Sequence, residues 1–188
     1  MKRALSPGLV VASPRLSAPP FDRSVVLVAE ASEQGAMGFV LNQPMGLSLG
    51  EVARQLNLEI RDELRPLPVW AGGPVRPEQG WIVVERAEGD DEPVGTMLRL
   101  RDRFVVVASQ EVLQDLMRDE RASFRLFLGY SGWGQGQLES EIRDGAWVPL
   151  DYDEARVLDG DWESMWHSLL QDAGLGTGTF WGRGGGRA

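Results

Sequence analysis

The chain has 188 residues, of which 28 are acidic and 19 are basic, so its formal net charge is −9. Hydrophobic residues make up 43% and charged residues 25% of the chain, which is typical of a globular domain. The chain has no Cys, one His and one Lys, and the Lys lies near the N-terminus. This composition excludes disulfides, thiolate metal sites, the paired histidines of zinc hydrolases and a P-loop lysine. No cofactor is expected.

The first three predicted elements are strands. Residues 8–12 form a short apolar segment, and residues 24–30 are nearly all apolar and β-branched, which is typical of a strand covered on both faces. Residues 36–42 make the next strand, after a turn marked by Gly35. The segments 24–30 and 36–42 are predicted to pair antiparallel at the centre of the fold, joined by a loop of about five residues.

Helix caps and loops divide the middle of the chain. Ser48 and Glu51 have capping-box spacing, which predicts a helix that runs to about Leu56. Ser109 is the expected N-cap of a second helix over residues 110–119. The remaining segments are predicted to be strands at 68–71, 80–85, 95–100, 103–108 and 124–129, separated by loops that include residues 72–77 and 86–93.

The C-terminal third contains the most glycine. A glycine-rich loop is expected after residue 129, followed by a short helix near 137–143 that Gly145 ends. Short strands are predicted at 146–150 and 155–158. A last helix begins at Asp161, because one apolar face is formed by Trp162, Met165, Trp166, Leu169 and Leu170.

These elements predict a mixed α/β (α+β) fold, formed as a single domain by residues 1–175. The last segment, 176–188, contains six Gly and is expected to be a flexible tail. The acidic balance argues against general nucleic-acid binding. No segment has the roughly 20 apolar residues of a membrane span, so no membrane partner is expected. We expect a cytoplasmic protein.

The most unusual stretch is Gly129-Tyr-Ser-Gly-Trp-Gly-Gln-Gly-Gln-Leu-Glu139. One interpretation is a ligand loop, because glycine lets the backbone approach a bound group and N–H groups that lead into a helix favour an anion. The other is a structural turn, in which Trp133 plugs the core while Gln137 and Glu139 cap neighbouring backbone. The stretch is not a hydrolase nucleophile elbow, because Trp133 occupies the position of the last Gly.

Polar and small residues near other strand ends also have two interpretations. Ser24 and Glu30 lie six residues apart in one predicted strand, hence on the same face. A buried Glu30 would have a raised pKa and could act as an acid or base, whereas a Glu30 at the strand end would be solvated, which we favour. Asn42 is expected to cap a turn. Gly72 and Gly73 form either a tight turn, which we favour, or a phosphate cradle.

Four motifs follow one another in the chain: Phe-x-x-Ser-Val-Val at 21–26, Gly-Ala-Met-Gly-Phe-Val-Leu-Asn-Gln-Pro at 35–44, Gly-Gly-Pro-Val at 72–75 and the stretch at 129–139. In order and spacing they resemble the YqgE/AlgH family of bacterial proteins, over residues 5–175. The resemblance implies a single α/β domain whose strands form a pseudo-barrel flanked by helices. It implies no established activity, although part of the family is named after a regulator of alginate biosynthesis.

Two positions depart from the family pattern. The family usually has Glu-His after the second strand, where this chain has Glu30-Ala31, and a His at the end of the strand after Gly-Gly-Pro-Val, where this chain has Val84. A function shared with the family would therefore depend on its Gly, Ser, Asn, Gln, Glu and Trp positions.

Three functions remain as alternatives. The first is a binding or regulatory protein for a small ligand or a protein partner, which fits the glycine-rich loops and the lack of a recognisable catalytic set. The second is an enzyme that uses a carboxylate such as Glu30 or Glu139, assisted by Ser or Arg. The third is a DNA-binding regulator, which the charge of −9 and the absence of a basic helix-turn-helix oppose.

The sequence assigns no catalytic or metal-ligating residue. Its candidate ligand-binding residues are Ser24, Glu30, Asn42, Gly72, Gly73, Ser131, Gly132, Trp133, Gln137 and Glu139. We expect the loop 129–139, the strand end at Glu30 and the turn 72–75 to meet on one concave surface, because each follows or ends a buried strand. Trp133 should then be partly exposed at the rim, and Glu30 or Glu139 should face the hollow.

Overall fold

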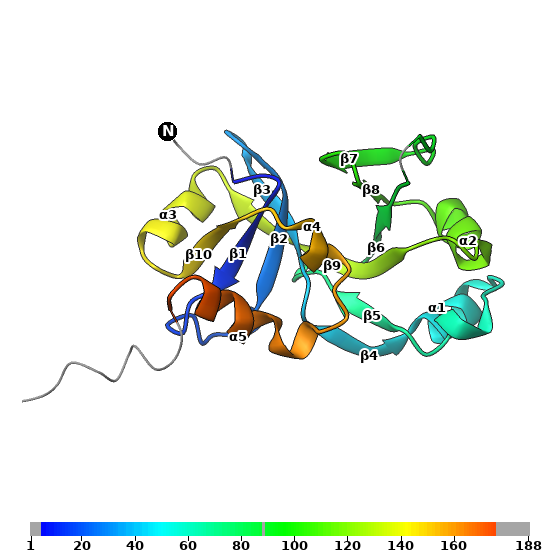
Figure 1. Cartoon of the computed structure of the whole chain (residues 1–188), viewed down its shortest axis with the longest axis horizontal. Coiled ribbons are helices and arrows are strands. Elements are labelled where there is room, and N and C mark those ends of the chain that lie inside the picture. Colours follow the sequence, from blue (N-terminus) through cyan, green and yellow to red (C-terminus); the bar gives the residue numbers. More distant parts are fainter. Residues whose placement is uncertain (1–4, 88, 176–188) are drawn as a thin grey trace, which may run out of the picture.

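The computed structural model describes residues 5–87 and 89–175, so the expected tail at 176–188 lies outside the described residues (Figure 1). The strands are β1 (Gly8–Ala12), β2 (Val25–Ser32), β3 (Gly35–Val40), β4 (Pro44–Ser48), β5 (Pro68–Ala71), β6 (Val75–Glu85), β7 (Thr96–Leu100), β8 (Phe104–Val107), β9 (Phe124–Gly134) and β10 (Trp147–Asp151). The helices are α1 (Leu49–Leu56), the 3-10 turn η1 (Asp62–Leu64), α2 (Gln110–Arg118), α3 (Gln137–Arg143), α4 (Glu154–Val157) and α5 (Trp162–Asp172).

The strands of the described chain form one curled sheet in the order β10-β1-β2-β3-β9-β6-β8-β7. All neighbours in this order are antiparallel, while β4 and β5 form a side branch in which β5 runs parallel to β9. Strand β7 packs against β2, so the sheet curls into a half-barrel. The predicted mixed α+β class with mainly antiparallel strands is confirmed. No helix of the described chain is long and apolar enough to cross a membrane.

Two halves can be distinguished along the sheet (Figure 1). The terminal half comprises residues 8–43 and 137–172, with strands β1, β2, β3 and β10 and helices α3, α4 and α5. The central half comprises residues 44–118, with β4 to β8 and helices α1 and α2. Strand β9 joins them, because it pairs with β3 on one side and with β6 on the other.

Three clusters of buried apolar residues form the core of the fold. The largest fills the inside of the curl and includes Leu27, Phe39, Phe104 and Phe127, against which α5 packs its apolar face. A second cluster lies beneath α1 and α2 in the central half. The third lies between α3 and the other face of the terminal strands. Strand β2 contributes alternate residues to two clusters, which explains its nearly continuous apolar sequence.

Local capping signals predict the helices correctly. The Ser48 Oγ accepts a hydrogen bond from the Glu51 N–H, while the Glu51 carboxylate accepts one from the Ser48 N–H, as expected of a capping box. Ser109 caps α2 by accepting from the Val112 N–H. The predicted antiparallel pairing of β2 with β3 is also confirmed, with Val26 opposite Val40.

Strand β4 was not predicted, and β6 begins at Val75, inside the expected loop 72–77. Three further segments differ from the prediction. The β2–β3 hairpin closes over residues 33–34, not over about five residues. The expected loop after 129 is instead a continuation of β9 to Gly134, because Gly129 adopts a φ of +68° within the strand and leaves room for the Gly73 carbonyl. The strand expected at 155–158 is helix α4, whose first turn is capped by the Asp153 side chain.

Candidate functional site

The three segments expected to converge do meet at one open hollow of about 380 Å³, here called the motif hollow. The end of β2 contributes Glu30, the end of β9 contributes Tyr130, Gly132 and Trp133, and the first residue of β6 contributes Val75. Strand pairing brings them together, since Ala36 of β3 lies opposite Trp133 and Val75 lies opposite Tyr130. Of the ten candidate residues, the hollow is lined by Glu30, Gly132 and Trp133.

The turn at Gly72 and Gly73 supports the hollow from behind without lining it. A Cβ atom on Gly72 would lie 2.3 Å from the Gly129 carbonyl oxygen, and one on Gly73 would lie 2.3 Å from the Ser131 nitrogen. The Ser131 hydroxyl is buried and donates to the Gly72 carbonyl at 3.0 Å. These residues therefore fasten the turn to the β9 backbone, which leaves no space there for a phosphate.

Ser24 and Asn42 lie at the start of β2, away from Glu30 at its other end. The buried Ser24 hydroxyl donates to the Phe21 carbonyl at 2.8 Å. The Asn42 side chain accepts from the Val25 N–H at 2.8 Å and donates to the Arg23 carbonyl at 2.9 Å. Both side chains tie backbone segments together.

The expectation that Ser24 and Glu30 share a face is wrong. A β-bulge between Val28 and Glu30 inserts one residue into β2 and reverses the alternation of its side chains. Ser24 is consequently fully buried, whereas Glu30 is exposed. The bulge also moves Glu30 to the side of Met37, another residue of the hollow.

Trp133 is buried, not partly exposed as expected, with 6% of its surface accessible. Its ring packs against Phe21 and Trp147, which also contact each other, and its indole N–H donates to the Glu141 carboxylate at 3.0 Å. The Trp147 indole N–H donates to the same oxygen at 2.8 Å. Trp133 is therefore a core residue of which one edge reaches the hollow.

The acidic partner of this cluster is Glu141, which the sequence analysis missed. Glu139 is exposed on α3 and does not line the hollow, so of the two carboxylates considered for it, Glu30 is the one that lines it. Gln137 connects the end of β9 with α3, because its side chain accepts from the Gly134 N–H at 2.9 Å and donates to the Glu141 carboxylate at 2.8 Å. The spacing of Gln137 and Glu141, one helical turn apart, was the available signal.

Glu30 differs from the other candidates because it combines a free carboxylate with a place in the lining of the hollow. It makes no hydrogen bond or ion pair with any described residue. It is also the only Asp, Glu, Lys, Arg or His side chain that lines the hollow. Opposite it, Tyr130 is half-buried and packs edge-on against Trp81 at 5.8 Å between ring centroids.

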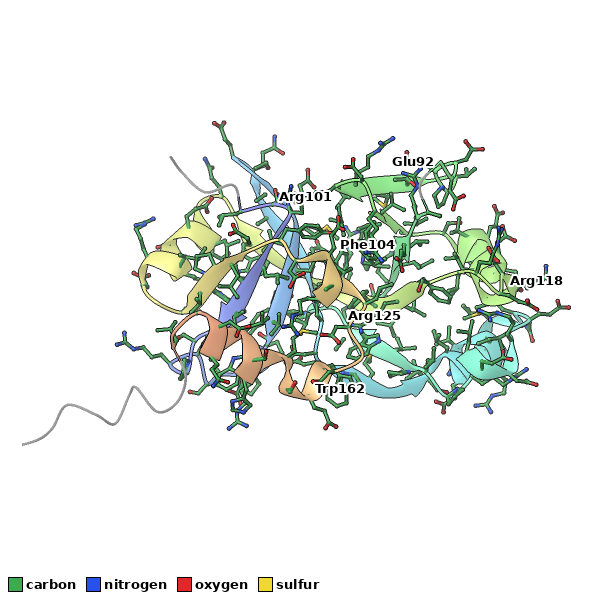
Figure 2. All side chains as sticks on the ribbon, in the orientation of Figure 1. Glu92, Arg101, Phe104, Arg118, Arg125 and Trp162 are labelled. Carbon is green, nitrogen blue, oxygen red and sulfur yellow. The ribbon has the colours of Figure 1, made fainter. Side chains whose placement is uncertain are left out.

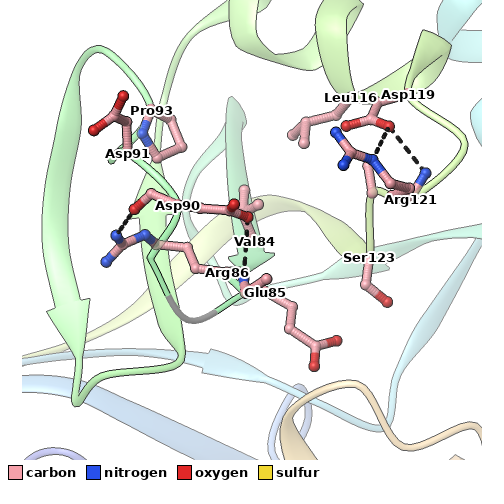
Figure 3. A pocket seen from close by; sticks show the side chains of 12 residues that line it. Val84, Glu85, Arg86, Asp90, Asp91, Pro93, Leu116, Asp119, Arg121 and Ser123 are labelled. Carbon is pink, nitrogen blue, oxygen red and sulfur yellow. Dashed lines mark hydrogen bonds and ion pairs between the residues drawn. The ribbon is translucent and has the colours of Figure 1, made fainter.

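A second hollow, of about 430 Å³, lies between the end of β6 and the C-terminal end of α2 (Figure 3). The sequence predicted only a solvated loop at 86–93. Several charged side chains of this hollow contact one another or the main chain. Arg121 pairs with Asp119 at 3.7 Å. Arg86 donates to the main-chain carbonyl of Asp90, and the Asp90 carboxylate accepts from the Ala87 N–H. Most charged groups of this hollow therefore already have partners, and Asp91 is the exception among the described residues.

The two positions that lack the family's His do not form one site. Ala31 packs with the apolar cluster around Trp133, while Val84 belongs to the cluster beneath α1 and α2. Within the described chain, no group of three or more His, Asp or Glu side chains is arranged to hold a metal ion.

Comparisons with known proteins show which family the sequence matches. The family described as AlgH-like matches residues 9–177. A UPF0301 protein of Anaeromyxobacter dehalogenans is 36% identical, covering 97% of this chain and 94% of its own, and one of Myxococcus xanthus is 38% identical, covering 91% and 92%.

Two solved structures share the fold. The solution structure of the AlgH protein from Pseudomonas aeruginosa has a TM-score of 0.73 and 28% identity, with all of both chains covered. A crystal structure of a Corynebacterium diphtheriae protein has a TM-score of 0.70 and 25% identity, and covers 91% of this chain and 88% of its own. The chain therefore belongs to the AlgH-like family.

Proposed function

We propose that this chain is a cytoplasmic binding protein, not an enzyme, and that the motif hollow receives a cationic group of a small ligand or of a protein partner. The observation that carries the proposal is the Glu30 carboxylate, which has no partner among the described residues and faces a hollow built by three motifs. A cation about 4 Å from it would gain about 1 kcal/mol in water and about 4 kcal/mol at the effective dielectric of a protein surface.

The aromatic wall supports the same ligand class. Tyr130 lines the hollow together with Met37 and Val75, so a cation that bears carbon substituents would meet both a carboxylate and an aromatic face. Contacts between a cation and an aromatic ring add about 0.5–1 kcal/mol at exposed sites. The surface accordingly favours amines and quaternary ammonium groups over anions.

The positions of the hydroxyl groups support binding over catalysis. The Ser24 and Ser131 hydroxyls donate to main-chain carbonyls, and the exposed His167 packs its ring against Trp166 on α5. Nucleophilic catalysis needs a nucleophile and a base within hydrogen-bond reach of each other. Glu30 shares the hollow with Ser32 and Tyr130 but makes a hydrogen bond to neither hydroxyl.

The test is a thermal-shift series with matched probes of opposite charge: butylamine, choline and a short lysine peptide against butyrate and a short glutamate peptide. A ligand that binds only the folded state raises the melting temperature by mass action. We expect stabilisation by at least one cationic probe and none by the anionic probes. Amide NMR shifts should map the bound probe to residues 30–37, 75 and 130–133.

Two variants separate this site from general attraction to an acidic protein. Glu30→Gln should abolish the stabilisation, whereas Glu33→Gln removes an equal charge from the adjacent hairpin turn, outside the hollow, and should preserve it. Stabilisation by anionic probes, or an equal loss in both variants, would contradict the proposal. The lysine peptide and choline distinguish a protein partner from a small ligand.

A further inference from the structure

A cavity of about 300 Å³ opens where β5, β9 and the segment before α5 meet, and it shares no lining residue with the motif hollow. Its walls are mainly aromatic and aliphatic, and they include Trp70, Phe124, Leu158 and Trp162. The one charged side chain in the lining is Arg125 of β9. Figure 2 marks Arg125 and, at the first turn of α5, Trp162.

Arg125 is buried, with only 7% of its surface accessible. One Nη atom donates to the Leu41 carbonyl at 2.8 Å and the other to the Asp159 carbonyl at 2.7 Å. The guanidinium carbon lies 4.0 Å from the centre of the Trp70 ring. The side chain therefore has aromatic and main-chain partners.

No carboxylate forms a direct ion pair with this cation within the described chain, although the charge of the nearby Asp159 partly offsets the cost of its burial. The carboxylate of Asp159, whose main chain Arg125 contacts, pairs with Arg156 at 3.0 Å. Burial lowers the pKa of Arg125 to about 10, which reflects the cost of holding its charged form there. Buried charges in proteins are normally paired, so a cation with only carbonyl and aromatic partners is unusual.

The guanidinium retains the capacity to bind an anion. It carries five N–H groups, and two of them donate to the carbonyls of Leu41 and Asp159. The other three have no acceptor among the described residues. A carboxylate in the cavity would supply acceptors and the missing negative charge in a poorly solvated site.

We propose that this cavity binds a small apolar carboxylate, such as an aryl or branched alkyl carboxylate, with the anion on Arg125 and the hydrocarbon part against the aromatic wall. Trp70 and Trp162 meet edge to face at 6.0 Å, so a ring entering the cavity has indole surfaces to contact. The volume is at the small end of the range for ligand pockets, about 300–1,000 Å³, which fits one ring and a carboxylate.

The experiment compares benzoate with its neutral analogue benzamide on the unmodified protein, by titration calorimetry and by NMR contacts to the indole groups. We expect benzoate to bind about 10–100-fold more tightly than benzamide, because the amide lacks the negative charge and the second acceptor oxygen through which a carboxylate pairs with a guanidinium. Magnetisation transfer should connect the benzoate ring with the Trp162 indole. Equal affinity of the two probes, no binding by either, or contacts confined to other residues would overturn the proposal.

Variants then test the cation itself. Arg125→Met should abolish the preference for benzoate, while Arg54→Met removes an exposed cation of the same chain and should preserve it. If Arg125→Met does not fold, Trp162→Ala provides the second test, because it shortens the aromatic wall and leaves the guanidinium in place. Trp162→Ala should weaken benzoate binding severalfold, and unchanged affinity in that variant would contradict the assignment.

Discussion

The terminal half and the central half differ in how completely their polar groups are satisfied. In the terminal half, the Glu141 carboxylate accepts from Trp147 and from Trp133 of the joining strand β9, and Ser24 and Asn42 bond to main-chain groups. In the central half, three buried side-chain nitrogen atoms have no hydrogen-bond partner in the described chain: Arg61 Nε, Trp81 Nε1 and Arg86 Nε.

Exposed apolar side chains show the same asymmetry. All of the large hydrophobic residues that are exposed in the described chain lie in the central half: Met45, Leu56, Leu67, Val94 and Met97. Val94 is 88% exposed and Met97 is 56% exposed. Most sequence motifs thus mark closely fitted contacts of the terminal half and its junction with β9, although Glu30 and Glu139 there have no partner among the described residues. The buried side-chain atoms without a hydrogen-bond partner in the described chain lie in the central half.

Gly35→Ala should have the largest effect, because it tests the tight fit of the terminal half. Gly35 has a φ of +139°, and a Cβ atom there would lie 2.2 Å from the Trp133 carbonyl oxygen. We expect a loss of about 3 kcal/mol or more in the free energy of unfolding, measured by urea denaturation. Gly46→Ala in the central half places its Cβ in open space and should change stability by less than about 0.5 kcal/mol. Similar losses of stability in the two variants would show that the two halves do not differ in how tightly they are packed.

Glu141→Leu should come next, since it leaves two buried indole N–H groups without their acceptor. Each unsatisfied donor costs about 1–3 kcal/mol, so we expect a loss of about 2–4 kcal/mol. Glu139→Leu on the same helix alters an exposed side chain and should stay within about 0.5 kcal/mol. Chemical denaturation of the two variants checks the difference, and equal stability would show that Glu141 does not anchor the tryptophans.

A pair of Trp→Phe substitutions compares the two halves directly. Trp147→Phe removes an indole that donates to Glu141, whereas Trp81→Phe removes an indole N–H that has no acceptor in the described chain. Both lose similar volume, so the hydrogen bond should make Trp147→Phe the more destabilising by about 1–2 kcal/mol. Calorimetric melting measures this difference, and a larger loss for Trp81→Phe would contradict the proposed asymmetry.

The smallest effect concerns the pH dependence of α1 in the central half. The hydrogen bond from the Ser48 N–H lowers the pKa of Glu51 below its ordinary value of 4.5. Because the folded-state pKa is the lower one, the stabilisation is present above the unfolded pKa and is lost as pH falls through the folded pKa. Melting temperatures between about pH 5 and pH 3 should therefore fall more for the parent than for Glu51→Gln. Parallel curves would refute this role for Glu51.

The amino-acid sequence alone determined the features that depend on residues within about one helical turn or one strand. The capping box of Ser48 and Glu51, the cap at Ser109 and the central hairpin all follow from short-range pattern and are present in the structure. The apolar face of α5 follows in the same way, from five residues at helical spacing. Such features arise from local hydrogen bonds and periodicity, so a linear chain displays them.

Tertiary structure decided what each polar residue does. The bulge between Val28 and Glu30 separated Ser24 from Glu30, and the neighbouring Gly73 backbone let β9 continue through Gly129. Arg125 became a buried cation only because β5 and the segment before α5 fold over it. Strand register, close backbone approach and burial depend on segments far apart in the chain, so the spacing of residues along the sequence cannot encode them.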